Sequence, residues 1–199
     1  PYQIATADNL LWFADQVNTG NGGICAKLTA NITLEPRGEG NKHMIGTSDN
    51  PFYGEFDGNN KTVSGVFIEW PEKESSTKYF YAGGLFGCIK ASTTTTAVVK
   101  NLTVKGNIST QKNIYDVYYI GGVIGIAYGN VIVDNVKSRV NIDIPLCDYV
   151  DAHCGGVVGS VEWFGNGNYK GTLTVSNCIN YGNLNVECGE ICGGVVGYI

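Results

Sequence analysis

The sequence is poor in charge. Charged residues make up only 16% of the 199 positions, and 13 Lys and Arg against 18 Asp and Glu leave a net charge of −5 at neutral pH. Nucleic acids and anionic membrane surfaces select basic patches, so this balance argues against both as partners. Apolar runs long enough for a membrane span, about 18 residues, are also lacking, and we predict no membrane insertion.

Proline, methionine and histidine are scarce, with 5, 1 and 2 residues. The low proline content excludes a collagen-like chain and a proline-rich linker. His43 and His153 are the two histidines, and the cysteines follow C-x6-C and C-x3-C spacings that fit no zinc site. We therefore predict neither a metal nor another cofactor.

The seven cysteines are odd in number and show no disulfide framework. Cys154 and Cys192 stand directly before a Gly-Gly pair, where Ala82 and Ile120 stand in the earlier copies of the same motif. A free thiol at such a position acts as a small apolar side chain. We predict that most of the cysteines are reduced and buried.

Glycine is abundant, with 28 residues, about twice the usual share. Many of the glycines belong to a motif, Gly-Gly-apolar-apolar-Gly, that occurs four times. Its Gly-Gly pairs begin at positions 83, 121, 155 and 193, so the spacings are 38, 34 and 38 residues. Repetition at a nearly constant period is the mark of a solenoid.

A second short element lies between the Gly-Gly motifs. It reads "VSGVFI", "VKNLTV", "VDNVKS" and "VSNCIN", beginning at Val63, Val99, Val133 and Val175. Both elements are rich in β-branched residues and alternate apolar with polar side chains, so we predict an all-β solenoid with about two β-coils in each period.

One position within this second element is occupied by residues that tolerate a left-handed backbone. Asn101, Asn135 and Asn177 share it, with Gly65 in the first period. Stacked asparagine amides can also hydrogen-bond along the pile. We interpret these residues, and the glycines of the motif, as architectural.

The beginning of the chain differs from the repeats. Thr6 is a candidate N-cap, and an apolar helical face follows it, formed by Leu10, Phe13, Ala14 and Val17. We predict a capping unit at 1–30 with a helix at about 6–20, and repeats over 31–199. The chain begins without Met and stops inside a Gly-Gly-Val-Val-Gly unit, so we expect a solenoid that is truncated at its C-terminus and continues in the natural protein.

The motifs "CGGVVG" and "VSNC", together with "GEFDGNNKTVSGV" and the N-terminal segment, resemble the GLUG-type repeats of bacterial secreted and cell-surface proteins. The resemblance covers nearly the whole chain. It implies a right-handed parallel β-helix, an extracellular or cell-wall location and an adhesin-like role. It supplies no catalytic residue, and it implies nothing about the irregular insertions at 70–81 and 160–172.

One functional hypothesis is a polysaccharide-degrading enzyme, either a lyase or a glycoside hydrolase of the pectate-lyase-like β-helix type. Such an enzyme needs converging carboxylates, or carboxylates that hold a cation beside a basic residue. Asp143, Asp148 and Asp151, close in sequence to His153, are the candidates. A solvated polar loop explains the same cluster, and no nucleophile with an adjacent base is recognisable.

The hypothesis that we favour is a non-catalytic binding module. If the residue before each Gly-Gly pair faces inward, the residue preceding it faces outward, which gives the row Tyr81, Tyr119, His153 and Ile191. Aromatic side chains in line can stack on sugar rings or on protein side chains. We therefore expect Tyr81, Tyr119 and His153, with Trp163 from a nearby insertion, to contact a glycan or a surface protein.

Two alternatives to ligand binding remain open. The aromatic row could serve only to stabilise the sheet. The chain could also be a stalk without a ligand. In each case we expect a monomeric, rod-shaped protein.

Overall fold

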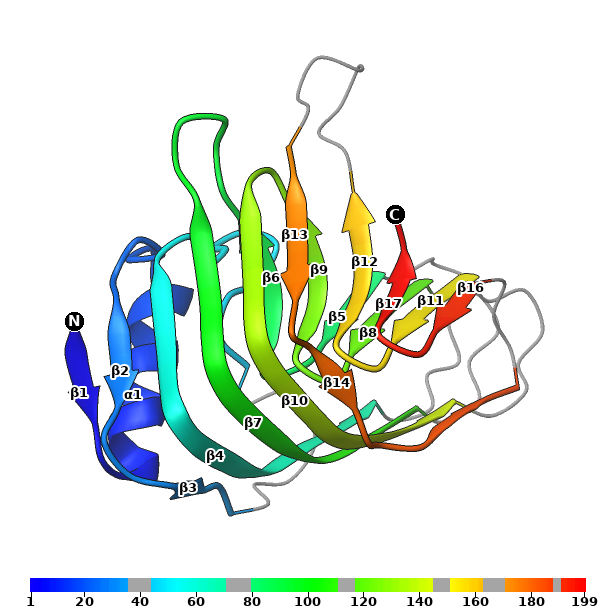
Figure 1. Cartoon of the computed structure of the whole chain (residues 1–199), viewed down its shortest axis with the longest axis horizontal. Coiled ribbons are helices and arrows are strands. Elements are labelled where there is room, and N and C mark those ends of the chain that lie inside the picture. Colours follow the sequence, from blue (N-terminus) through cyan, green and yellow to red (C-terminus); the bar gives the residue numbers. More distant parts are fainter. Residues whose placement is uncertain (36–43, 71–79, 111–116, 145–150, 163–170, 188–190) are drawn as a thin grey trace.

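The computed structural model describes residues 1–35, 44–70, 80–110, 117–144, 151–162, 171–187 and 191–199. These residues form three parallel β-sheets and one α-helix (Figure 1). The predicted all-β class with parallel sheets is therefore confirmed. In the described part of the chain, the helix is too short to cross a membrane.

The N-terminal segment contains the short strands β1 (Tyr2–Ile4), β2 (Ala26–Leu28) and β3 (Ile32–Thr33) and the helix α1 (Ala7–Asn18). Thr6 caps α1, because its backbone is extended and its hydroxyl accepts a hydrogen bond from the Asn9 N–H at 3.2 Å. The predicted face of Leu10, Phe13, Ala14 and Val17 is buried. Phe13 meets Phe52 and Phe56 edge-on, at 6.1 and 5.9 Å between ring centroids, so the helix packs onto the first strands of the core.

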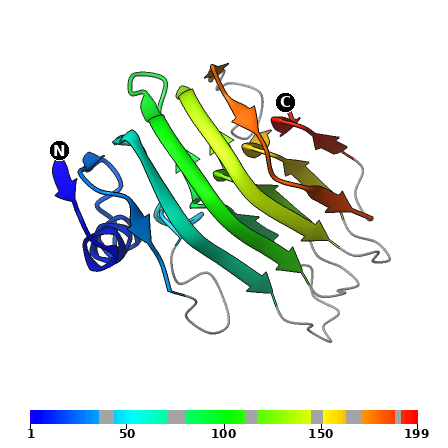
Figure 2. The same ribbon diagram turned by 60° about the horizontal axis from the view of Figure 1, so that its bottom comes forward.

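The described strands, β1 to β3 included, fall into three sheets that the chain visits in turn (Figures 1 and 2). The long sheet has the order β1-β2-β4-β7-β10-β13, with β3, β14 and β15 paired beside this path. The first short sheet has the order β16-β11-β8-β5, and the second short sheet has the order β17-β12-β9-β6. The bounds of these strands are β4 (Glu55–Trp70), β5 (Phe80–Gly83), β6 (Phe86–Lys90), β7 (Ala97–Thr110), β8 (Val117–Gly121), β9 (Ile124–Tyr128), β10 (Val131–Ile144), β11 (Asp151–Gly155), β12 (Val158–Glu162), β13 (Leu173–Ser176), β14 (Ile179–Asn180), β15 (Leu184–Val186), β16 (Ile191–Gly193) and β17 (Val196–Tyr198).

Each sequence period makes one circuit of the three sheets. Val133 pairs with Val99 and His153 with Tyr119, both 34 residues apart, while Phe86 pairs with Ile124 at a separation of 38. These separations equal the spacings of the Gly-Gly pairs, so neighbouring strands are one full period apart. The prediction of two coils per period is wrong, because the two elements of a period belong to different sheets of the same circuit.

The Gly-Gly motif is the corner between the two short sheets. It joins β5 to β6, β8 to β9, β11 to β12 and β16 to β17. The apolar residues after it point into the core: Leu85, Val123 and Val157 are each at most 1% exposed. Burying a side chain of this size contributes about 1.5–3 kcal/mol.

The left-handed asparagine position is confirmed. Asn101, Asn135 and Asn177 have φ of 53°, 52° and 54°. The Asn135 amide donates to Asn101 Oδ1 at 2.9 Å, and the Asn101 amide donates to Asp57 Oδ1 at 3.1 Å. The amides therefore bond from strand to strand across the long sheet.

The assignment of Gly65 to this position is wrong. In β4, Asp57 pairs with Lys100 and Lys61 pairs with Leu102, so the residues opposite Asn101 are those between Asp57 and Lys61. Asn59 and Asn60 lie there, with φ of 49° and 58°. Gly65, with φ of 78°, lies at a second irregularity between Val63 and Val66.

Candidate ligand-binding face

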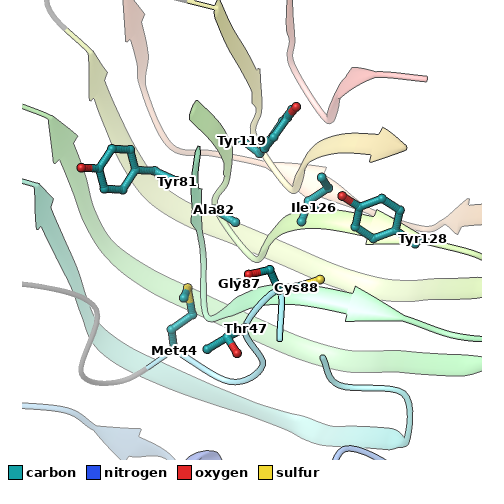
Figure 3. A pocket seen from close by; sticks show the side chains of 10 residues that line it. Met44, Thr47, Tyr81, Ala82, Gly87, Cys88, Tyr119, Ile126 and Tyr128 are labelled. Carbon is teal, nitrogen blue, oxygen red and sulfur yellow. The ribbon is translucent and has the colours of Figure 1, made fainter. Parts of the chain in front are cut away.

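A pocket of about 470 Å³ opens where the two short sheets meet (Figure 3). It is lined by Met44, Thr47, Ser48, Tyr81, Ala82, Gly87, Cys88, Tyr119, Ile126 and Tyr128. Two of the predicted site residues, Tyr81 and Tyr119, therefore line one cavity. All ten side chains are uncharged at neutral pH, and three of them are tyrosines.

One wall of the pocket is the segment around Met44, which precedes β4. Two parallel bridges tie this segment to the second short sheet, Ile45 to Phe86 and Phe52 to Ile89. The Asn18 side chain at the end of α1 holds it from the other side, donating to the Met44 carbonyl at 2.9 Å and accepting from the Gly46 N–H at 2.8 Å. The capping helix thus positions a wall of the pocket.

Glycine at position 87 allows this wall to lie close to the sheet. A Cβ atom on Gly87 would collide with the end of the Met44 side chain and would lie 2.7 Å from the backbone carbonyl oxygen of Gly46. The close approach of Met44 to β6 thus depends on the last glycine of the first Gly-Gly motif.

The predicted aromatic row is present for three of its four members. Tyr119 lies opposite His153, and His153 lies opposite Ile191, on the neighbouring strands β8, β11 and β16. The Tyr119 and His153 rings meet edge-on, with centroids 5.3 Å apart. The strands of this row adjoin, so its side chains follow one another at about 4.8 Å.

Tyr81 does not belong to this row. It pairs with Tyr118, and its ring stacks on the buried Tyr118 ring at 5.3 Å with 18° between the planes. Ala82 lies opposite Tyr119 instead. The expected alignment failed because of the corner between the sheets. Gly83 pairs with Ile120 and Phe86 pairs with Ile124, so the corner between β5 and β6 is one residue shorter than the corner between β8 and β9. A slip of one residue moves each side chain of a strand to the other row.

His153 is held on several sides. Its Nδ1 lies 3.2 Å from Ser160 Oγ, and its ring lies 4.6 Å from the Tyr198 ring, tilted by 32°. Ser160 is fully buried. His153 therefore joins the aromatic row of the first short sheet to side chains of the second.

Sequence reasoning missed the contribution of the second short sheet. Cys88, Ile126, Ser160 and Tyr198 form a row there, each following the third glycine of its motif. Tyr128 lies two residues beyond Ile126 on the same strand. The signal was available, because the residue after "GGxxG" recurs once per period, as does the residue before it.

The carboxylates of the enzyme hypothesis are only partly described. Asp143 lies on β10, is exposed, and accepts a hydrogen bond from the Asn185 amide at 2.6 Å. Asp148 and the predicted site residue Trp163 lie outside the described residues, and Asp151 is placed on β11 by its backbone. Among the described side chains, no three of His, Cys, Asp and Glu are grouped as metal ligands.

The outer face of the long sheet carries a polar network. Partial burial raises the pKa of Asp57, but the Asn59 N–H, the Asn101 amide and the nearby lysines outweigh it and hold this pKa below its usual value. Hydrogen bonds from the Ser176 hydroxyl and the Asn177 amide, at 2.6 and 2.9 Å, lower the pKa of Asp134. These carboxylates accept bonds between neighbouring strands, which is a structural role.

Comparison of the chain with protein families, with curated proteins and with solved structures found no match.

Proposed function

We propose that this protein is a non-catalytic binding module whose pocket at the junction of the two short sheets takes a neutral glycan. The observation that carries the proposal is the pocket of about 470 Å³ that Tyr81, Tyr119 and Tyr128 line together. Binding sites for small molecules are concave and mostly apolar, with a few polar groups that orient the ligand. Here tyrosine rings offer apolar faces to a sugar, and the Thr47 and Ser48 hydroxyls offer hydrogen bonds.

The charge of the lining favours a neutral ligand over an acidic one. A uronic acid or a sialic acid would bring a carboxylate, and desolvating it without a cationic partner is costly. The described lining residues include no Lys or Arg. A neutral hexose or N-acetylhexosamine unit meets no such cost in this pocket.

The architecture that we propose around this site is a right-handed parallel β-helix of the GLUG type, on a secreted or cell-surface bacterial protein with an adhesin-like role. The one-period separation between paired strands supports the β-helix. Crossovers between parallel strands are right-handed in about 98% of cases, which supports the handedness.

The decisive experiment is a glycan array followed by calorimetric titration of the best neutral ligand. We expect Tyr119→Ala to weaken binding roughly two- to tenfold, the range of an aromatic contact. Tyr119→Phe keeps the ring and should retain most of the affinity. Tyr181→Ala is the matched control, because Tyr181 is 56% exposed and lies against Arg139 on the long sheet.

Three results would overturn the proposal. An array without any neutral glycan ligand would leave a stalk as the better explanation. Equal losses in the Tyr119 and Tyr181 variants would place the ligand elsewhere. Turnover of a bound polysaccharide that is abolished in Asp148→Ala or Asp151→Ala would establish the enzyme hypothesis instead.

A further inference from the structure

Two cysteines lie directly opposite each other on neighbouring strands. Cys154 of β11 pairs with Cys192 of β16, between the pairs His153–Ile191 and Gly155–Gly193. Residues in register on parallel strands point to the same side of the sheet, so both thiols lie on one face. Both cysteines are free thiols.

The strand spacing suits a disulfide bond. Neighbouring strands are about 4.8 Å apart, and disulfides form between Cα atoms about 4.4–6.8 Å apart. The bond also needs the Cβ atoms at about 3.5–4.5 Å, a slightly closer approach.

The two cysteines differ in access, as the two members of a reactive dithiol do. Cys154 is fully buried, whereas Cys192 is exposed. The neighbouring Cys154 thiol lowers the pKa of Cys192 to about 7, against the effect of partial burial. The same contact, together with burial, raises the pKa of Cys154. Cys192 is thus the exposed thiol of the pair, and its lowered pKa favours the thiolate.

We propose that Cys154 and Cys192 form a redox site that reacts with low-molecular-weight disulfides and closes into a reversible cross-strand disulfide. The Cys192 thiolate attacks one sulfur of the reagent RS–SR, forms a mixed disulfide and releases RS⁻, which takes up a proton. Cys154 then gives up its proton and attacks the Cys192 sulfur, which displaces the second RS⁻. Two protein thiols are oxidised, and one RS–SR is reduced to two RSH.

Two other described cysteines, Cys88 and Cys178, lack this arrangement. Cys88 is buried and lies opposite Ile126. The Cys178 thiol donates to the carbonyls of Ser176 and Val133, at 3.2 and 3.4 Å. Cys178→Ser is therefore a matched control that removes one thiol and leaves the pair intact.

The test is oxidation of the folded 199-residue protein with oxidised glutathione, followed by alkylation of the free thiols and mass spectrometry. We expect a protein that has lost two hydrogens and carries no glutathione, with the new bond mapped by peptide analysis to Cys154 and Cys192. Cys154→Ser should stop at a mixed disulfide on Cys192, and Cys192→Ser should react at least tenfold more slowly. Cys178→Ser should behave as the wild type.

Circular dichroism of each serine variant tests whether it is folded. The disulfide mapping of the wild-type protein tests the proposal even if a variant fails to fold. A wild-type protein that resists oxidation or stops at the mixed disulfide would overturn the proposal. A bond that maps to another pair, such as one with Cys147 or Cys188, would overturn it as well.

Discussion

Replacement of Asn135 by alanine tests whether the left-handed asparagine position stabilises the fold. The residue has φ of 52°, and its amide donates to Asn101 Oδ1 at 2.9 Å and to Asn60 Oδ1 at 3.3 Å. Alanine at this φ costs about 1–2 kcal/mol in backbone strain. The lost hydrogen bonds add about 0.5–1.5 kcal/mol, so we expect the free energy of unfolding to fall by about 2–3 kcal/mol.

Two companion variants separate the contributions. Asn135→Gly removes the amide without the strain and should cost about 1 kcal/mol. Asn141→Ala removes a similar amide, which donates to Asn107 Oδ1 at 3.1 Å and accepts from the Asn183 N–H, from a residue without a positive φ. Urea unfolding followed by circular dichroism gives the three values. If Asn135→Ala costs no more than Asn141→Ala, the left-handed backbone contributes nothing and the reasoning fails.

Three further changes have defined outcomes. Phe86→Ala removes a fully buried ring whose centroid lies 5.3 Å from those of Phe52 and Phe56. The free energy of unfolding, measured by urea titration, should fall by about 3–5 kcal/mol, and a loss below about 1 kcal/mol would contradict this packing. Because the pKa of Asp57 is lowered, its stabilising contribution is complete above the unfolded pKa of about 3.8 and disappears as the pH falls through the lower folded value. Asp57→Asn should therefore reduce the loss of stability between pH 5 and pH 2. An unchanged acid profile would refute the assignment. Burial raises the pKa of Cys88 to about 12, so this thiol should resist a disulfide reagent at pH 8 in the native protein and react after denaturation, with native labelling as the contrary result.

The buried cysteine prediction holds only in part. Cys88 and Cys154 are buried, Cys25 and Cys178 are half-buried, and Cys192 is exposed. All five are free thiols, while Cys147 and Cys188 lie outside the described residues. The repeat correctly assigned Cys154 and Cys192 to one shared position, and the structure pairs them directly. A position in a repeat, however, does not state how much of the chain covers a side chain.

The fold class and the helix could be predicted from the sequence because both depend on residues that are close together in the chain. Thr6 and the apolar face at Leu10, Phe13 and Val17 predict the helix, and its observed range of Ala7–Asn18 lies within the predicted one. The repeated Val-x-Asn pattern predicts both the strand and its left-handed residue. These features depend on residues within one turn or one strand of each other.

The number of circuits in each sequence period could not be predicted from the same pattern. Two β-elements in a period are compatible with two coils or with one circuit around three sheets. The structure has one circuit, because the Gly-Gly corner turns the chain into a new sheet directly after β5, β8, β11 and β16. A corner of two glycines gives no sequence signal for the angle through which it turns.

The candidate site shows the same limit. Alternation correctly placed Tyr119 and His153 in one row, since each stands two residues before its Gly-Gly pair. It misplaced Tyr81, because the first corner is shorter by one residue in the pairing of β5 with β8. Alternation also could not predict that Met44 lines the pocket. The Asn18 side chain of α1 holds the Met44 carbonyl by a hydrogen bond, and α1 is far from Met44 in the sequence.

The slip at β5 explains why the pocket lies at the N-terminal end of the short sheets. Where the row continues regularly, His153 follows Tyr119 and fills the space beside it, and its ring contacts Tyr198 across the corner. In the first circuit the slip puts the small Ala82 opposite Tyr119 and carries the Tyr81 ring onto Tyr118. An alanine in place of an aromatic side chain leaves a hollow, and Met44 walls it on the open side because Gly87 lets it approach. The irregular circuit, rather than the regular repeat, therefore creates the cavity that we propose as the glycan site.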